Sequence, residues 1–347
     1  MSNVYNNVCY LSAAVLIVGV HVPHQVAAQS LNYDTLATLE EPLAFAAGDI
    51  TFELRGLLDG ATHYNFETDS FDPRGVANFQ IDAETQLPNR WTIRASYFGQ
   101  YSSDPGDITG VGGGGSNDRY SDNAAGFVGG AWGTVFGGNV TGIVREETRR
   151  VRGVGNAALA FDNAFGGLDT IGAGYIGRFG PAVLAGVVDP DGLFDVGGTW
   201  SRPIGKVDYS FSLRGNRGEF ISQDNTTVFD TYSISGVADV IYGSSTFDLG
   251  VGYESFSSPF IRDLDRWFVS AGGQHKIGAL TVSLEGHIGE LDGNTEQAIA
   301  AGVQYDIARG LSANWGVNHA KLNAARPGVV IERKDATEAI FSLRYSY

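Results

Sequence analysis

Residues 247–254, Phe-Asp-Leu-Gly-Val-Gly-Tyr-Glu, alternate strictly between large apolar residues and small or acidic ones. Successive side chains of a β-strand point to opposite faces, so this period of two predicts a strand with one apolar and one polar face. An amphipathic helix would place apolar residues three as well as four apart, and no two large apolar residues of this stretch are three apart. The stretch therefore predicts a two-faced β-sheet.

The same alternation recurs from Gly48 to the C-terminus, and it predicts about sixteen strands. The expected spans are 49–59, 76–86, 91–102, 122–132, 134–144, 170–179, 181–189, 193–202, 206–216, 230–242, 244–256, 265–277, 279–290, 295–307, 311–322 and 336–347.

The length of each connection depends on whether it follows an even-numbered or an odd-numbered strand. Those that follow even-numbered strands are short and centre on turn residues such as Pro88, Gly133 and Gly243. Most of those that follow odd-numbered strands are longer, namely 60–75, 103–121, 145–169, 217–229, 257–264 and 323–335. Short turns at one end and long loops at the other are typical of a transmembrane antiparallel β-barrel.

The apolar face could meet either lipid or a protein core, because soluble β-sandwiches also alternate. Aromatic residues at the strand ends favour lipid, since they form girdles at both membrane interfaces. They are Trp91, Tyr101, Trp132, Trp200, Tyr242, Trp267, Trp315, Tyr345 and Tyr347. A soluble lectin or propeller would show repeats of roughly 40–50 residues, and we see none.

The N-terminus has the pattern of a secretory signal peptide. Residues 10–20 form an apolar core that is too short to span a bilayer, and small residues precede a cleavage site after Ala28. The usual positive charge is missing from residues 1–8, which leaves a buried N-terminal element as the alternative. We therefore divide the chain into a signal peptide (1–28), an amphipathic or irregular lead-in segment (29–48) and a transmembrane β-barrel (49–347).

Composition narrows the classes of partner and cofactor. A net charge of −16 disfavours nucleic acid, which needs a basic face. One cysteine and histidines without metal-ligand spacing give no thiolate or imidazole metal site, so we expect no cofactor. Asp189 and Asp191 could hold a weakly bound calcium ion with other loop oxygens, although a tight turn is the more common use of this pattern.

The segment 126–180 resembles general porins of Gram-negative bacteria, especially the alphaproteobacterial kind, and the C-terminus resembles that of outer-membrane barrels. Residues 126–138, Gly-Phe-Val-Gly-Gly-Ala-Trp-Gly-Thr-Val-Phe-Gly-Gly, resemble the porin hairpin before the third external loop. Residues 165–169, Phe-Gly-Gly-Leu-Asp, resemble part of that loop. The alternating end of the chain, 339–347, resembles the terminal strand that the barrel assembly machinery recognises, with Tyr347 where the family usually has Phe. The Pro-Glu that often precedes the loop motif is replaced by Asn163-Ala164.

The resemblance implies a sixteen-stranded, homotrimeric barrel in the outer membrane, through which small hydrophilic solutes diffuse passively. It also implies that the third external loop, here 145–169, folds into the lumen as a constriction. The chain then belongs to a divergent branch of the family, because its local motifs match only loosely.

Charged residues on the predicted lumen face could form this constriction. Its basic wall would consist of Arg55, Arg94 and Arg344, because the last strand of a closed barrel pairs with the first. Its acids would come from the third loop, namely Glu146, Glu147, Asp162 and Asp169. Alternatively, the arginines pair with wall acids such as Glu53 and Glu84.

A second basic group lies at the start of the same loop: Arg145, Arg149, Arg150 and Arg152. We expect it to fix the loop, because neighbouring guanidinium groups need carboxylate partners. The acidic net charge predicts a weak preference for cations.

Other functions leave fewer signs in the sequence. An outer-membrane enzyme could use Ser283 and His287, but residues four apart in a strand are about 13 Å apart. We therefore expect no enzyme. A substrate-specific, plugged or structural barrel remains the alternative to a general pore, and a specific channel would need lumen-facing aromatic residues such as Phe98 and Phe268.

Overall fold

A computed structural model describes residues 43–103, 120–140, 142–148, 150, 153–155, 168, 171–221, 228–259, 261–322, 325–326, 329–330 and 335–346. The predicted signal peptide and the first part of the predicted lead-in segment lie outside these ranges.

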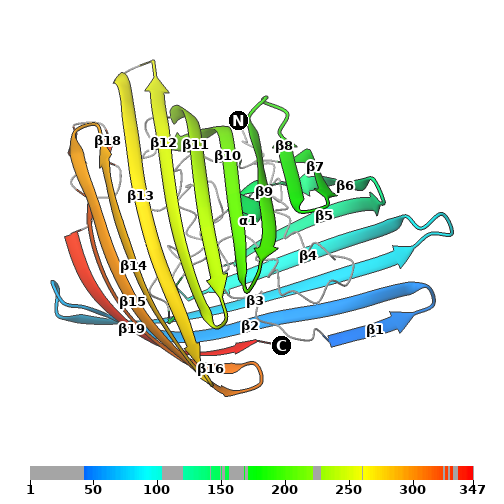
Figure 1. The fold of residues 1–347 in the computed structure, drawn as a ribbon, viewed down its shortest axis with the longest axis horizontal. Helices are drawn as coiled ribbons and strands as arrows, with labels where there is room; N and C mark the ends of the chain where they lie inside the picture. The colour runs from blue at the N-terminus through cyan, green and yellow to red at the C-terminus, as the bar shows by residue number, and fades with distance from the viewer. Residues whose placement is uncertain are drawn as a thin grey trace, which may run out of the picture.

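Sixteen antiparallel strands form one closed ring (Figure 1). Each strand pairs with its neighbours in the chain, β9 pairs with β10, and the last strand, β19, pairs with β2. The strands of the ring are β2 (Ile50–Asn65), β3 (Ser70–Gln86), β4 (Thr92–Ser102), β5 (Tyr120–Gly130), β6 (Gly133–Asn139), β7 (Ile171–Phe179), β8 (Ala182–Val188), β9 (Phe194–Ile204), β10 (Val207–Ile221), β11 (Val228–Tyr242), β12 (Ser245–Ser258), β13 (Ile261–Ile277), β14 (Leu280–Leu291), β15 (Asn294–Ala308), β16 (Leu311–Leu322) and β19 (Asp335–Ser346).

Four shorter elements are added to the ring. Strand β1 (Leu43–Ala47) pairs with β2, and strands β17 (Ala325–Arg326) and β18 (Val329–Val330) pair with each other. Helix α1 (Ile143–Thr148) follows β6. Among the described residues, no helix has the length and apolarity that crossing a bilayer requires.

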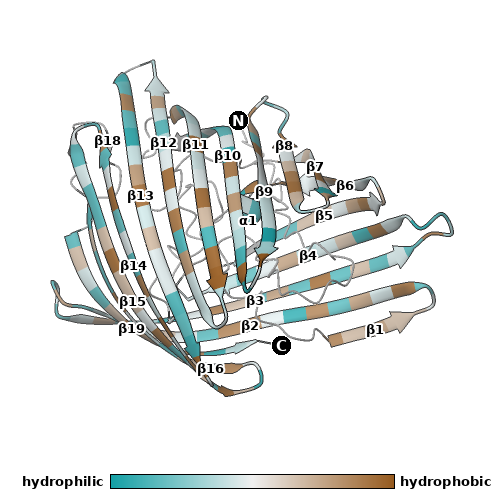
Figure 2. Cartoon of the chain, viewed as in Figure 1, coloured by the Kyte–Doolittle hydropathy of each residue, from teal (hydrophilic) through white to brown (hydrophobic). Residues whose placement is uncertain are grey.

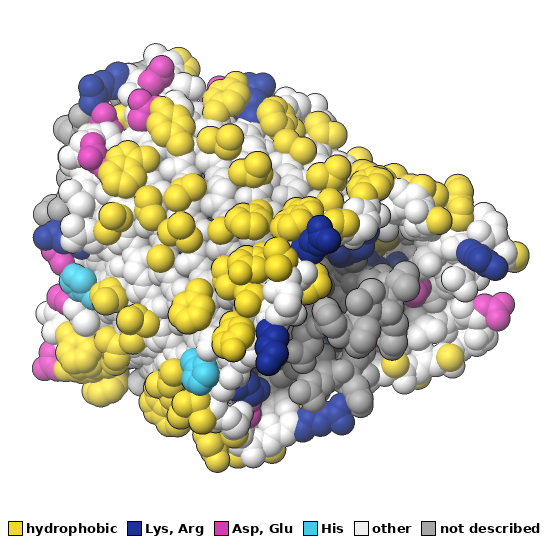
Figure 3. Space-filling view, in the orientation of Figure 1, with side chains coloured by type: hydrophobic (Ala, Val, Ile, Leu, Met, Phe, Trp, Pro, Cys, Tyr) yellow, Lys and Arg dark blue, Asp and Glu magenta, His cyan; other side chains and the backbone are white. Residues whose placement is uncertain are grey.

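The two faces of the sheet differ as the alternation predicts. Along β12, Phe247, Leu249 and Val251 are exposed on the outer face, whereas Asp248 and Glu254 are buried on the inner face. Hydropathy accordingly changes from residue to residue along the strands (Figure 2). Hydrophobic side chains are spread over the outer surface in view, and charged side chains lie mainly towards its edges (Figure 3). An apolar exterior around a polar interior is the arrangement of a barrel that faces lipid.

The observed strands match the predicted spans in number and order, but several extend into the predicted loops: β12 and β13 leave only residues 259–260 of the loop expected over 257–264, and β10 and β11 leave 222–227 of that expected over 217–229. Two further differences change an element more strongly. Strands β2 and β3 continue towards each other and leave only residues 66–69 as their connection, where a loop over 60–75 was expected. The predicted strand over 134–144 ends at Asn139, and Ile143 and Val144 begin α1 instead. Ile143 and Val144 are β-branched apolar residues, which are common in strands, so residue type favoured a strand although the two adjacent residues break the alternation.

Strand pairing also begins before residue 49. Strand β1, within the predicted lead-in segment, pairs with the first residues of β2, and Phe45 stacks on Phe52 with ring centroids 5.1 Å apart. The register of β2 places β1 just beyond the end of β19, which pairs with β2 only as far as Leu57. The two strands thus follow one another along the same edge of β2.

Candidate functional site

Helix α1 packs on the inner face of the barrel. It contacts β8, β9 and β10, and the hydroxyl group of Thr199 on β9 donates a hydrogen bond to the carbonyl oxygen of Glu147. Ile143 and Val144 are buried in an apolar cluster on the inside of the wall. The other members are Ala125, Phe127, Phe136, Val140, Leu168, Ile176, Ala185, Val187 and Leu193. One sector of the inner face is therefore apolar and covered.

Glycine lets the helix approach the wall closely. A Cβ atom at Gly197 would lie 2.9 Å from Thr148 and 3.1 Å from Val144. Such distances are shorter than ordinary van der Waals contacts, so a larger residue at this position would push α1 away. The glycine-rich sequence of this sector thus serves packing between the loop and the wall.

Beyond the helix, the same connection is anchored to a different part of the wall. The guanidinium group of Arg150 donates hydrogen bonds to Asp248 on β12 and to Glu285 on β14, the latter at 2.9 Å. The backbone N–H of Gly153 donates to Glu285 at 2.8 Å, and that of Val154 donates to the Ser283 hydroxyl group at 2.9 Å. The described parts of the β6–β7 connection therefore contact the inner faces of strands on both sides of β11.

The strand order places α1 opposite the seam of the barrel. In the ring, the sector that α1 contacts, β8–β10, is half a turn away from β16, β19 and β2. The predicted basic wall lies in and beside that opposite sector. Arg55 on β2 and Arg344 on β19 therefore lie across the interior from α1, whereas Arg94 on β4 lies nearer to the helix.

Two of the three wall arginines are paired with carboxylates. Arg55 donates to Glu53 at 2.9 Å, and Arg344 donates through two nitrogen atoms to Asp59 at 2.9 and 2.6 Å. The pairing of Arg55 with the wall acid Glu53 is the alternative that the sequence analysis left open. Asp59 is the corresponding wall acid for Arg344. On β2 and β19 the wall therefore carries paired positive and negative side chains rather than a purely basic surface.

Arg94 is the third wall arginine, and its surroundings differ. Its side chain is 5% exposed, and its guanidinium group lies over the ring of Phe127, 4.5 Å from the centroid. Its Nε and Nη1 atoms have no hydrogen-bond partner in the described structure. Glu84 is its neighbour in the register of β3 and β4.

The predicted loop residues are described only in part. Glu146 and Glu147 lie on α1, and Glu147 is 3.5 Å from the guanidinium group of Arg178 on β7. Burial raises the pKa of the Glu147 carboxyl group, and Arg178 opposes this shift. Arg145 lines a small cavity between α1 and the wall, together with Arg150. Four of the predicted site residues lie outside the described residues: Asp162, Asp169, Arg149 and Arg152.

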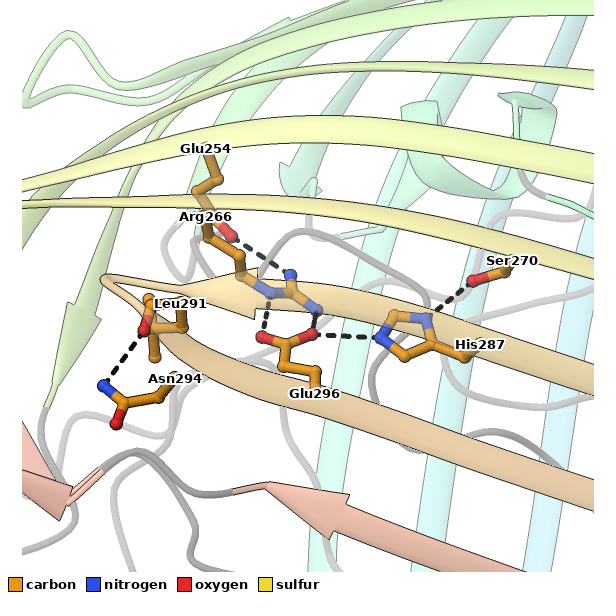
Figure 4. Close-up of polar contacts among 7 residues, drawn as sticks. All are labelled: Glu254, Arg266, Ser270, His287, Leu291, Asn294 and Glu296. Carbon is orange, nitrogen blue, oxygen red and sulfur yellow. Dashed lines mark hydrogen bonds and ion pairs between the residues drawn. The ribbon is translucent and has the colours of Figure 1, made fainter.

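A buried polar network on β12–β15 was not predicted (Figure 4). Arg266 donates to the carboxylate of Glu296 at 2.6 and 3.0 Å, and it lies 3.4 Å from Glu254. His287 is 3.0 Å from Glu296 through Nε2 and 2.8 Å from the Ser270 hydroxyl group through Nδ1. In the sequence each of these residues is only one polar position of an alternating strand. Nothing in the sequence indicates that the four strands bring them together.

Another buried ion pair joins β9 and β10. Arg214 donates through Nε and Nη2 to Asp195 at 2.9 and 2.7 Å. Two parallel bonds between a guanidinium group and a carboxylate form the strongest and most directional kind of ion pair in proteins.

Asp189 and Asp191 lie in the tight connection between β8 and β9. A carboxylate oxygen of Asp189 accepts hydrogen bonds from the backbone N–H groups of Asp191 and Leu193, at 3.0 and 2.9 Å. This is the geometry of an Asx-type turn. The described residues contain no group of three or more histidine, cysteine or acidic side chains placed to hold a metal ion.

Comparison with known proteins gives no match to a family model and none to a curated protein. Solved structures do match. The anion-selective porin from Comamonas acidovorans has a TM-score of 0.61 and 13% identity, with 86% of this chain and 100% of that chain covered. OmpT, an outer-membrane protein of Vibrio cholerae in its trimer form, has a TM-score of 0.64 and 11% identity, with 86% and 99% covered.

A mutant of the Rhodopseudomonas blastica porin has a TM-score of 0.54 and 14% identity, with 85% of this chain and 100% of that chain covered. At such low identity the similarity shows the fold and nothing finer. The chain folds as a closed, sixteen-stranded antiparallel β-barrel of the kind found in bacterial porins.

Proposed function

We propose that this chain is an outer-membrane porin whose water-filled interior lets small hydrophilic solutes and ions diffuse passively. The observation that carries the proposal is the closed ring with an apolar exterior and a polar interior. In lipid every backbone polar group must be satisfied within the protein, and closure of a sheet does so without leaving an edge. The polar inner side chains then provide a hydrated path.

The β6–β7 connection would narrow this path. Its described residues contact the inner faces of β8–β10, β12 and β14, and β8–β10 lie opposite the arginine-bearing seam. We propose that the connection and the seam wall together form the constriction, with Arg94 as the wall arginine that has no hydrogen-bonded carboxylate in the described structure. Because Arg55 and Arg344 are paired, we expect the net charge of −16 to give a weak cation preference.

Export and assembly follow from the same proposal. We infer that the signal peptide directs the chain out of the cytoplasm and that β19 is recognised by the barrel assembly machinery. We further propose a homotrimer, because β6 and β8 have only seven residues each. A tilted strand needs about 9–11 residues to cross the membrane, so β6 and β8 are too short to span it. We infer that a neighbouring copy, rather than lipid, packs against the outer face of these short strands.

Ser270, His287 and Glu296 form a serine–histidine–acid series, but we propose that it is structural. Arg266 binds both oxygens of the Glu296 carboxylate and so neutralises the acid. The backbone around Ser270 is paired with strands on both sides, whereas acyl transfer needs N–H groups aimed at a developing oxyanion. We therefore propose no enzymatic activity.

Swelling of liposomes tests the proposal directly. Purified, folded protein is incorporated into liposomes, which are then diluted into isotonic solutions of neutral sugars of increasing size. A porin should cause rapid swelling with the smallest sugar and progressively slower swelling with larger ones. No swelling with any sugar, from protein shown to be folded, would favour the plugged or structural barrel.

A further inference from the structure

An arginine lies on the outer face of the barrel, at the short-turn end of β9. Arg202 is exposed and shares its face with Trp200 and Ile204, of which Ile204 is 59% exposed. In the strand register it lies opposite Tyr209 of β10. Within the described structure its side chain has no hydrogen-bond or ion-pair partner. A cation on the face that a membrane barrel turns towards lipid is tolerated near the interface and not at the centre of the bilayer, so Arg202 lies close to the headgroups.

Two further basic side chains at the same end of the barrel have no acidic partner among the described residues. Lys206 lies in the β9–β10 turn and Arg90 in the β3–β4 turn, and both are exposed. The long-loop end differs, because basic side chains there contact aspartates. These pairs are Arg74–Asp72, Arg217–Asp230, Arg262–Asp292 and Lys321–Asp335. In a chain with a net charge of −16, unpaired cations at one end indicate a partner outside the protein.

Aromatic residues indicate the depth of these cations in the membrane. Trp91 follows Arg90 directly and is 42% exposed, and its ring centroid lies 5.9 Å from that of Trp132 in the next short turn. Trp200 lies two residues before Arg202 on the same face of β9. Tryptophan and tyrosine residues on the outside of a membrane protein lie at the level of the lipid headgroups. The cations beside them therefore reach the phosphate groups, as long basic side chains do at an interface.

The positions of the cations around the ring favour lipid over a single soluble anion. The β3–β4 and β9–β10 turns are separated by strands β5–β8, so one small anion cannot contact Arg90 and Arg202 together. Lipid headgroups surround the barrel and can contact each of them. A phosphate group accepts two parallel hydrogen bonds from a guanidinium group. A net negative headgroup is favoured, because the ammonium group of a zwitterionic lipid brings another cation close to the arginine.

We propose that the short-turn end of the barrel binds anionic phospholipids of the adjoining leaflet through their phosphate groups. Arg202 and Lys206 form one contact site, and Arg90 forms another. The long-loop end, where the exposed Glu290 lies opposite Trp267, has no such preference. The proposal rests on the membrane location in the proposed function and adds a lipid partner to it. It does not require that the channel conducts ions.

Quenching of tryptophan fluorescence by lipids with brominated acyl chains tests the proposal. Two proteins are incorporated into bilayers, one that keeps only Trp200 and one that keeps only Trp267, with phenylalanine at the other tryptophan positions. Brominated phosphatidylglycerol and brominated phosphatidylcholine are compared at each tryptophan. Phosphatidylglycerol should associate about fivefold more strongly near Trp200, because each basic residue at an anionic membrane surface contributes about that factor. Near Trp267 it should not be preferred.

The double variant Arg202→Gln with Lys206→Gln should remove the preference near Trp200, whereas Arg202→Lys should keep it because the charge remains. Arg262→Gln is the matched control, because it removes an exposed cation of the long-loop end that is paired with Asp292, and it should leave the preference near Trp200 unchanged.

Equal association of the two lipids near Trp200, or a preference that survives in the double variant, would overturn the lipid site and leave the porin proposal intact. A lipid preference in inserted protein that gives no conductance would support the lipid site and contradict only the open channel. Protein that inserts into neither bilayer would contradict the membrane location and the lipid site together.

Discussion

Arg150 and Glu285 form a buried ion pair with a nitrogen–oxygen distance of 2.9 Å, although they lie 135 positions apart in the chain. Both side chains are almost fully buried, and Asp248 completes the arrangement as a second partner of Arg150. One arginine of a loop thus joins two strands of the wall that are not neighbours. This contact explains how a connection between β6 and β7 is held in the interior.

Removal of Arg150 should release the connection and destabilise the barrel. Arg150→Met removes the guanidinium group that binds two buried carboxylates, and breaking a buried ion pair by removing one partner costs about 3–5 kcal/mol. We expect an earlier thermal unfolding transition and noisier single-channel current. Arg217→Met is the control, because its contact with Asp230 is exposed and 3.7 Å long, and it should change unfolding little. Equal unfolding of the two variants would contradict the anchoring role of Arg150.

The wall beneath the connection should not tolerate a side chain at Gly302. A Cβ atom there would lie 1.7 Å from the carbonyl oxygen of Val154, so Gly302→Ala must displace the loop. We expect faster amide hydrogen exchange at residues 153–155 and altered conductance. Gly286→Ala on β14 is a matched control, because nothing lies within 4 Å of its added Cβ atom. Unchanged exchange in Gly302→Ala would show that the loop is not seated on this strand.

Docking of α1 should depend on pH through Glu147. Burial raises the pKa of its carboxyl group above the ordinary value, which means that the docked helix favours the protonated form. The stabilisation is complete below the ordinary range of glutamate, about 4.3, and is lost as the pH rises through the raised folded value. Hydrogen exchange of α1 amides should therefore slow as the pH falls through this window, after correction for the intrinsic rate.

The variant Glu147→Gln separates this effect from general acid sensitivity. Glutamine has nearly the same shape and does not titrate, so corrected exchange of α1 should no longer change with pH in that window. A pH dependence as large as that of wild type would assign the effect to another group.

Closure of the ring should depend on the contact between Arg344 and Asp59, which joins the last strand to the first. Asp59→Asn keeps the size of the side chain and removes the charge that accepts two hydrogen bonds from Arg344. The two side chains are largely buried, so we expect a loss of about 1.5–3 kcal/mol, in the range of hydrogen bonds to charged groups. The measurement is heat modifiability on gels, which gives the temperature at which the folded barrel unfolds and should be lower for Asp59→Asn. Glu53→Gln, at the more exposed Arg55 contact, is the control and should lower it less.

The sequence predicts the strands of this protein well because each strand lies between two different media. Residues 247–254 alternate because one face of the strand is apolar and exposed on the outside of the barrel and the other face is polar and lies inside. The same alternation is present in most strands of the ring. It fails where the interior is apolar as well. Ile143 and Val144 look like the end of a strand because α1 needs apolar residues against an apolar inner wall.

The interior contacts could be predicted only in part. An arginine in the third loop that needs carboxylate partners is visible in the sequence, but the partners themselves are not. Asp248 and Glu285 are two among many acids on alternating strands, and only the ring brings them to Arg150. The pairing of Arg344 with Asp59 likewise requires that the last strand close on the first.

Single-channel recording in a planar bilayer tests the central claim most directly. Detergent-purified, heat-modifiable protein is added on one side under a salt gradient, and the conductance steps and the reversal potential are measured. A porin of this kind should give large, stable steps that arrive in threes, with a reversal potential that shows a weak cation preference. Folded protein that inserts and gives no conductance would contradict the account and leave a barrel without an open channel.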